Sequence, residues 1–290
     1  MADAGAGLSR TQTVHIGGFT ISAFVEREFR LDGGTMFGVV PRVMWEKLVM
    51  PDEKNTVAMQ TNLFVVTTPH EEKILLDTGL GDALSDFDRK MYAVTTPSNM
   101  ISGLAKLGYG PENIDWVILT HLHTDHANGL FAGDPDAPGL FFPNARYVIQ
   151  EAEWEAANHP NERTAAVYYP GRLAAITTAG KLQLVSGTAE ILPGITVEQT
   201  GGHTAGHQGV KVEADGEAFV YYADIFPSRF HVKTPFVASV DTHPLDTIQS
   251  KKKLLHWCRE NNAIIGFDHD TEYLMGRLVE GKKWLEVGPV

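Results

Sequence analysis

The sequence contains a single cysteine, Cys258, among 290 residues, which excludes an intramolecular disulfide. Cys258 lies in a helical pattern with Leu254, Leu255 and Trp257, and we interpret it as a small buried apolar residue rather than a catalytic thiol. The amino-terminal stretch lacks the basic start and apolar run of a secretory signal, and no apolar segment approaches the length of a membrane span. These absences predict a reducing, cytoplasmic setting and no membrane partner.

Basic residues are also scarce, since 24 Lys and Arg face 36 Asp and Glu, for a formal net charge of −12. The one basic run, 251–253, is interpreted as the solvated face of a helix. Proteins that bind nucleic acid normally carry a basic face, so we expect a small-molecule substrate and no nucleic-acid partner. A homodimer is compatible with the sequence, but no feature of the sequence specifies one.

Strand and helix patterns are mixed along the whole chain, with no internal repeat or linker, which predicts one domain over 1–290. A segment over 31–50 reads as a loop or short helix that packs over another part of the protein. Strand patterns cover 13–16, 19–25, 62–67, 73–77, 116–119, 196–199, 210–213, 218–222 and, as the last clear strand, 264–267. Helix patterns cover 97–107, 151–158, 163–178 with a break at Pro170, and 245–260. This mixture predicts a two-sheet core with helices outside.

The most informative segment is Thr120-His121-Leu122-His123-Thr124-Asp125-His126, directly after the apolar strand pattern 116–119. Histidine nitrogens and aspartate oxygens are the usual ligands of zinc and similar divalent ions. Residues at i and i+2 of an extended segment point the same way, so His121 and His123 can face one ion. Asp125 and His126 lie past the strand end and can serve a second ion nearby. A solvated polar loop would explain the composition of this segment but not its placement.

Three further segments carry candidate ligands at strand ends. A glycine-rich turn over 200–207 contains His203 and His207, and its glycines are expected to let the backbone pass close to an ion. Asp224 ends the strand pattern 218–222, and His269 stands between two aspartates after 264–267. Each segment is weak evidence alone, and together with the first they indicate a metal centre.

In this order, His121-x-His123-x-Asp125-His126, Gly202-His203-Thr204, Asp224 and His269 resemble the ligand signature of the metallo-β-lactamase superfamily, over about 62–270. The resemblance implies an α/β (α+β) fold, an αββα sandwich of two mixed β-sheets flanked by helices, with the site at one edge between the sheets. It implies one ion on His121, His123 and His203, a second on Asp125, His126 and His269, and Asp224 bridging both. It also implies that His203 rather than His207 is the ligand, and that Asp77 supports the metal loop without binding metal.

A narrower resemblance, carried by 32–41, 200–203 and 223–227, is to the YtnP-type quorum-quenching lactonases. It implies ring opening of N-acyl homoserine lactones. Some lactonases carry a tyrosine three residues after the bridging aspartate, but Pro227 stands here, which leaves the oxyanion-stabilising group unassigned. Tyr221 and Tyr222 are expected to alternate between core and surface. Candidate substrate-pocket residues are Met36, Phe37, Trp45 and His231, with plain core packing as the alternative for the first three and surface exposure for His231.

Two divalent ions, with Zn²⁺ favoured over Co²⁺, Mn²⁺ or Fe²⁺, would activate a bridging hydroxide for attack on a carbonyl or phosphoryl centre. Asp125 would act as both ligand and proton carrier. A phosphotriesterase, an arylesterase or a glyoxalase II-like thioesterase on the same site are the alternatives within hydrolysis. A sulfur dioxygenase or a di-iron oxidoreductase is disfavoured by the full ligand set and by His123, where di-iron relatives usually carry glutamate. That full ligand set also disfavours a non-enzymatic metal-binding protein.

Overall fold

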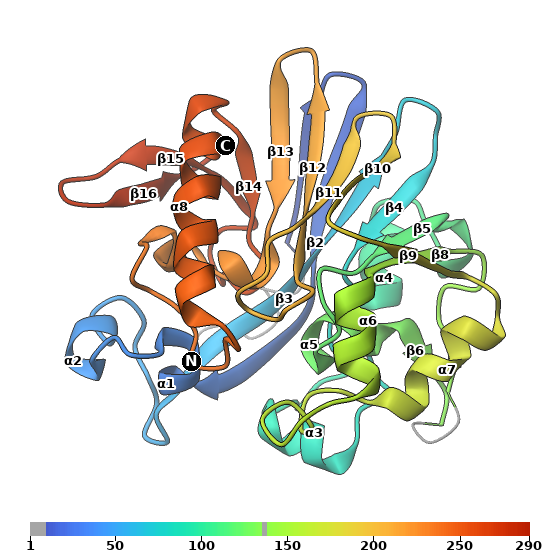
Figure 1. Cartoon of the computed structure of the whole chain (residues 1–290), viewed down its shortest axis with the longest axis horizontal. Helices are drawn as coiled ribbons and strands as arrows, with labels where there is room; N and C mark the ends of the chain where they lie inside the picture. The colour runs from blue at the N-terminus through green and yellow to red at the C-terminus, as the bar shows by residue number, and fades with distance from the viewer. Residues whose placement is uncertain (1–9, 135–137) are drawn as a thin grey trace.

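Two large β-sheets pack face to face with helices on their outer sides in the computed structural model, which describes residues 10–134 and 138–290 (Figure 1). In spatial order the first sheet contains β1 (Thr11–Ile16), β2 (Phe19–Asp32), β3 (Thr56–Thr67), β4 (Lys73–Leu76), β5 (Trp116–Ile118), β8 (Arg146–Gln150) and β9 (Leu182–Val185). The second contains β10 (Thr188–Leu192), β11 (Ile195–Gln199), β12 (Gln208–Ala214), β13 (Glu217–Tyr221), β14 (Ile264–Gly266), β15 (Met275–Glu280) and β16 (Leu285–Gly288). The strands β6 (Phe131–Ala132) and β7 (Gly139–Leu140) form a separate small ribbon.

The helices are short apart from one that covers the second sheet. The α-helices are α1 (Gly33–Phe37), α2 (Arg42–Trp45), α3 (Asp86–Met91), α4 (Met100–Lys106), α5 (Thr124–Ala127), α6 (Glu151–Asn158), α7 (Pro170–Thr178) and α8 (Pro244–Glu260). The 3-10 turns are η1 (Pro111–Asn113), η2 (Asn128–Leu130), η3 (Ala223–Ile225) and η4 (Arg229–Val232). In the part of the chain that is described, none of these helices has the length and apolarity needed to cross a bilayer.

Three apolar clusters hold the layers together. The central cluster joins the two sheets, with Val66 of β3 and Val210 of β12 among its fully buried members. A second cluster lies between the first sheet and the helices α4 and α7, and a third lies between the second sheet and α8. This order of layers confirms the predicted αββα sandwich.

The strand predictions were incomplete at the edges of both sheets. The nine predicted strands all exist, but β8, β9, β10, β15 and β16 were missed, and 264–267 is therefore not the last strand. The predicted helix 163–178 begins only at Pro170, because proline lacks the backbone N–H that a helix interior needs but a first turn does not. The segment 31–50 forms α1 and α2, which pack in a fourth cluster with Phe29 and Tyr92.

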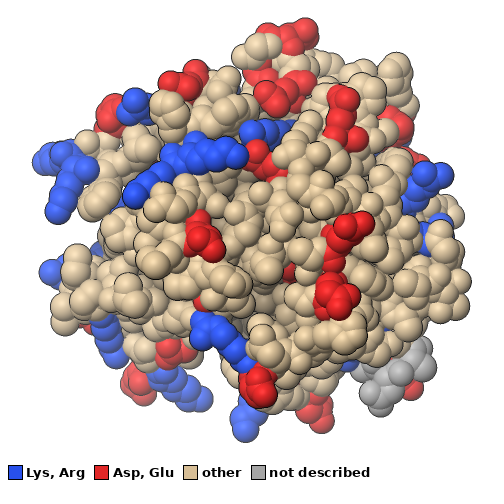
Figure 2. Space-filling view, in the orientation of Figure 1, with Lys and Arg blue, Asp and Glu red and all other residues tan. Residues whose placement is uncertain are grey.

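Charged side chains of both signs are spread over the face seen in Figure 2, with Lys and Arg gathered in its upper left part. The predicted solvated run 251–253 was wrong at Lys251, which is 1% exposed on α8. The buried face of α8 consists of Thr247, Lys251, Leu254, Leu255 and Cys258, whereas Leu245 is exposed. Lys251 Nζ donates to the Phe236 carbonyl, and burial lowers the pKa of Lys251 to about 7.

We expect Lys251→Met to change how stability depends on pH. The folded protein loses the Lys251 proton near pH 7, whereas the unfolded chain keeps it to about 10.5, so the natural protein gains stability as pH rises through this window. The variant lacks this gain. Its free energy of unfolding relative to the natural protein should therefore be highest near pH 7 and fall by on the order of a few kcal/mol towards pH 10.

Urea denaturation at a series of pH values measures this difference. Lys253→Met, at a position whose side chain is 78% exposed, is the matched control and should follow the natural protein at every pH. Parallel pH profiles for Lys251→Met and the natural protein would contradict the prediction.

Candidate metal centre

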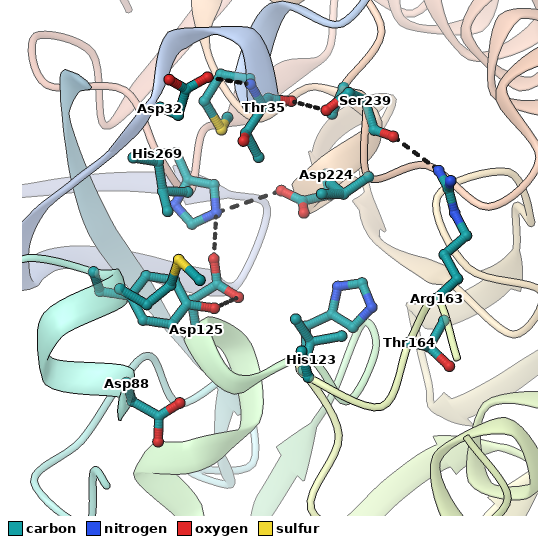
Figure 3. A pocket seen from close by; sticks show the side chains of 18 of the residues that line it. Asp32, Thr35, Asp88, His123, Asp125, Arg163, Thr164, Asp224, Ser239 and His269 are labelled. Carbon is teal, nitrogen blue, oxygen red and sulfur yellow. Dashed lines mark hydrogen bonds and ion pairs between the residues drawn. The ribbon is translucent and has the colours of Figure 1, made fainter. Parts of the chain in front are cut away.

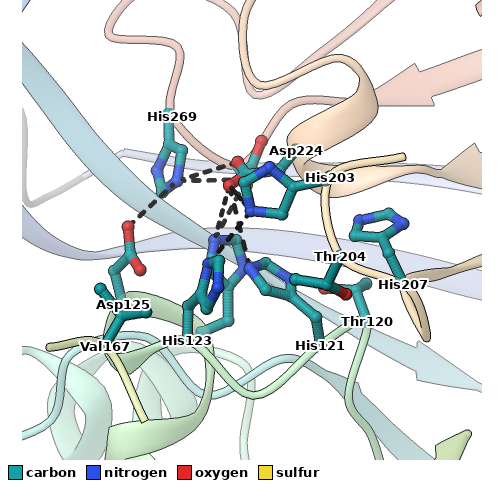
Figure 4. Close-up of polar contacts among 12 residues, drawn as sticks. Thr120, His121, His123, Asp125, Val167, His203, Thr204, His207, Asp224 and His269 are labelled. Carbon is teal, nitrogen blue, oxygen red and sulfur yellow. Dashed lines mark hydrogen bonds and ion pairs between the residues drawn. The ribbon is translucent and has the colours of Figure 1, made fainter. Parts of the chain in front are cut away.

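The candidate ligands gather where strands of both sheets end at the same edge of the sandwich (Figure 4). The segment 121–126 follows β5, which runs parallel to β4. Asp224 and His269 follow β13 and β14, which are also parallel to each other. Parallel neighbours bring their carboxyl ends to one edge, and sheet packing then sets the two edges against each other.

One group of ligand atoms comes from His121, His123, His203 and Asp224, all within 4.8 Å of one another. His203 Nε2 lies 2.9 Å from Asp224 Oδ2 and 3.1 Å from His123 Nδ1. His121 Nε2 lies 3.9 Å from the same Asp224 oxygen.

The second group consists of His126, Asp224, Asp268 and His269. His269 Nε2 lies 3.4 Å from Asp224 Oδ1 and 3.6 Å from Asp125 Oδ2, so Asp125 adjoins this group. Asp224 Oδ2 lies 2.9 Å from His203 Nε2 of the first group and 3.7 Å from His126 Nε2 of the second, and Oδ1 faces His269, which places this carboxylate between the two groups.

These residues fit divalent cations. The buried Nε2 atoms of His121, His126 and His269 have no hydrogen-bond partner among the described residues. The contacts of 3.6 to 3.9 Å between ligand atoms are too long for hydrogen bonds. Two atoms each 2.0–2.2 Å from an ion at a tetrahedral angle are roughly 3.3–3.6 Å apart, a range that includes the contacts of His269 Nε2 with Asp268, Asp224 and Asp125.

The other ring nitrogen of most ligand histidines is anchored. Nδ1 of His126 bonds Asp77, Nδ1 of His203 bonds Asp241, and Nδ1 of His269 bonds the Gln60 carbonyl, at 2.8–2.9 Å. Such contacts fix the ring orientation and leave Nε2 free for an ion. Asp77 also accepts from the backbone N–H and hydroxyl of Thr120 and from the hydroxyl of Tyr221. It therefore connects β4, the metal loop and β13.

The pKa values in this cluster show the electrostatics of a site built for cations. Burial lowers the pKa of His126, but the Asp224 and Asp125 carboxylates outweigh it and raise that pKa to about 9. His269 is raised in the same way to a pKa of about 10, mainly by Asp268 and Asp224. Burial and neighbouring histidines hold the pKa of His121 well below its usual value. Without an ion, His126, His203 and His269 thus hold protons more tightly than a free imidazole does, and metal binding must displace them.

Glu153 of α6 contacts both histidine loops, a role that no motif in the sequence indicates. Its buried carboxylate accepts from the Leu122 backbone N–H, between His121 and His123, and from the Thr204 hydroxyl beside His203. Burial raises the pKa of this carboxyl group. Glu153 therefore holds the two loops in register.

Gly202 of the glycine-rich turn allows close packing against α8. Gly202 has φ +93°, and a Cβ there would lie 2.6 Å from the Thr247 backbone nitrogen of α8. His207 is fully buried, with its Nδ1 2.7 Å from the Thr200 hydroxyl, and its ring lies 5.3 Å from that of His121. His207 belongs to neither ligand group.

A cavity of about 360 Å³ opens over the cluster (Figure 3). His123, Asp125, Asp224 and His269 form its floor. Its walls are mainly apolar and include Leu31, Met36, Phe87, Met91, Tyr92, Val167 and Val240. Arg163 spans one side, donating to the carbonyls of Ser239 and Asp241 at 2.8 Å.

Of the four predicted substrate-pocket residues, only Met36 lines this cavity. Phe37 stacks between Trp45 and His231, with ring centroids 5.2 Å apart on each side, and all three are buried. His231 Nε2 bonds the Met36 carbonyl, and burial lowers the pKa of His231 to about 3. Phe37, Trp45 and His231 therefore do not line the cavity, because their rings pack against one another in the core.

Tyr221 and Tyr222 do not alternate between core and surface, because helix α8 covers the outer face of β13 and both rings are fully buried. Other residues of the site were not predicted at all. Asp241, Gln60 and Tyr92 carry no local signal, whereas Asp268 stands directly beside His269 in the sequence.

The comparisons with known proteins agree with this geometry. The family model of the metallo-beta-lactamase superfamily matches residues 56–272. An N-acyl homoserine lactonase of a Bacillus species is 26% identical over 219 residues, covering 71% of this chain and 80% of that protein.

Two solved structures share the fold over nearly the whole chain. A probable metal-dependent hydrolase from Staphylococcus aureus has a TM-score of 0.87 and 30% identity, covering 96% of this chain and 99% of its own. AidC, a dizinc quorum-quenching lactonase in complex with a product, has a TM-score of 0.77 at 22% identity, covering 98% of each chain, and shows the fold alone. The chain therefore belongs to the metallo-beta-lactamase superfamily, as a hydrolase with lactonases among its relatives.

Proposed function

We propose that this hydrolase holds two divalent metal ions and opens the ring of N-acyl homoserine lactones. The observation that carries the proposal is the ligand cluster on the floor of a cavity whose walls are mainly apolar. A lactone ring with its amide is polar and an acyl chain is apolar, so such a substrate matches the floor and the walls in turn. The lactonase relatives support the same substrate class.

In this proposal His121, His123 and His203 would hold one ion, Asp125, His126 and His269 would hold the other, and Asp224 would lie between them. When bound, the ions supply Lewis acidity and lower the pKa of water. Zinc is the expected metal because the ligand set is mostly imidazole with carboxylates.

Asp125 and Tyr92 are the proposed groups that act on the substrate. Asp125 is positioned at the cavity floor to accept a proton from the attacking water and to return it to the alkoxide when the ring C–O bond breaks. The Tyr92 hydroxyl lies 3.5 Å from Asp125 Oδ1, and burial and the nearby Asp125 raise its pKa well above the usual value. Tyr92 therefore keeps its proton and can donate to a substrate oxygen, a role that Pro227 cannot fill.

The substrate class is tested with a panel of short- and long-chain N-acyl homoserine lactones beside an organophosphate triester, an aryl ester and a glutathione thioester. The lactones should give the highest kcat/KM. A higher kcat/KM for the triester or thioester would replace the lactonase proposal by the corresponding activity.

We expect about two divalent ions per chain, mainly zinc, in protein purified without chelator. Elemental analysis measures the content, and removal of the ions by chelator should abolish hydrolysis until metal is restored. A reproducible value of one ion or fewer, with activity retained, would contradict the dinuclear site.

Asp125→Asn should keep the fold but lose about 10²- to 10⁴-fold in kcat, because the amide cannot carry the proton. Lactone hydrolysis and metal content are measured on the same sample. Asp215→Asn, in the exposed turn between β12 and β13, makes the same chemical change away from the site and should leave kcat unchanged. Near-natural turnover of metal-loaded Asp125→Asn would refute the role of Asp125.

Met36 and Phe37 form a matched pair for the acyl-chain wall. Met36→Ala should lower kcat/KM for long-chain lactones more than for short-chain ones, through about 0.8 kcal/mol per methylene left unburied. Phe37→Ala removes a ring behind the wall and should lower the melting temperature by several degrees through its cavity, with an unchanged chain-length profile. The reverse pattern would place the acyl chain on the other side of α1.

A further inference from the structure

Asp268 is a buried carboxylate to which the proposed set of metal ligands assigns no role. It follows β14, is 2% exposed, and neither of its side-chain oxygens has a hydrogen-bond partner among the described residues. Asp270, two residues along the same loop, is equally buried but accepts from the side chain and the backbone N–H of Arg229. The loop therefore satisfies one of its carboxylates fully and leaves the other open.

The open carboxylate points at the second ligand group. Asp268 Oδ2 lies 3.3 Å from His269 Nε2 and 3.8 Å from His126 Nε2, both of which also lack a hydrogen-bond partner in the described chain. These are the separations expected between ligands of one ion. The ion pairs formed by the described residues bring no lysine or arginine to Asp268.

A buried ionised carboxylate needs a positive partner, since an unpaired charge in a protein interior is costly. Asp224 and Asp268 both border this position, and Asp125 adjoins it from the cavity side. The first group has Asp224 as its one carboxylate. The second position is thus the more anionic and the richer in oxygen.

We propose that Asp268 is a further ligand of the ion held by His126, Asp224 and His269, and that it makes this position more favourable than the first for oxygen-preferring cations such as Mn²⁺. The inference rests on the two-ion part of the proposed function and is independent of the lactone substrate.

The test measures metal binding by calorimetric titration of the metal-free full-length protein with Zn²⁺ and, in a separate experiment, with Mn²⁺. In Asp268→Asn one of the two binding steps should weaken at least about tenfold while the other is unchanged, with the larger loss for Mn²⁺. Asp32→Asn is the control, because it removes one negative charge from the cavity wall. Asp32 is the N-cap of α1, and asparagine is an equally good N-cap residue. This variant should bind both ions as the natural protein does.

Thermal unfolding separates a ligand from a structural residue. Asp268→Asn should gain less in melting temperature on adding metal than the natural protein does, because it lacks one of the proposed ligands. Asp268→Glu, which keeps the charge, should retain more of the weakened step than Asp268→Asn. If Asp268→Asn fails to fold without metal, Asp268 is structural and the proposal is overturned.

Binding isotherms of Asp268→Asn that match the natural protein, or equal losses in the Asn and Glu variants, would also overturn the assignment. A natural protein that binds two ions but hydrolyses no lactone would refute the proposed substrate and leave Asp268 as a ligand. A natural protein that binds at most one ion would refute both.

Discussion

The structure depends on holding a group of imidazoles and carboxylates together in an interior that water scarcely reaches. Asp224 is central to this group, because its two oxygens face different sets of histidines. Ionised carboxylates that are buried together repel one another, so positive charge beside them stabilises the group. Metal binding and the stability of this edge of the sandwich are therefore coupled. When no ion is bound, the same carboxylates raise the pKa values of His126 and His269.

The scaffold meets this requirement with residues that never touch the cavity. Asp77 ties a ligand histidine to β4 and β13, Asp241 fixes His203 from the loop before α8, and Glu153 joins the two histidine loops through α6. Each is a buried carboxylate with satisfied oxygens, so each restrains a ligand without competing for an ion. The two sheets position the loops that carry the histidines, and these three carboxylates fix the orientation of the histidine rings and loops.

The cavity above the cluster is set by segments that come from different parts of the chain. Met36 of α1, Met91 of α3 and Val240 before α8 form an apolar wall, while Arg163 secures the loop that carries Asp241. That loop therefore contributes both to the cavity wall, through Val240, and to the orientation of His203, through Asp241. The apolar wall at Met36 is supported by the stacked rings of Phe37, the last residue of α1, and Trp45 of α2.

The sequence by itself determined which segments carry the candidate metal ligands, and it determined the sandwich, because both depend on short-range patterns. His121 and His123 alternate on one extended segment, and strands show their period locally. Tertiary structure alone decided which carboxylate supports which histidine, as for Asp241, and brought Asp268 to the second group. Tertiary packing also decided which face of α8 contacts the second sheet, and this face includes the buried Lys251. Such partners are chosen by how two sheets and a helix pack, and packing joins residues whose separation along the chain leaves no periodic trace.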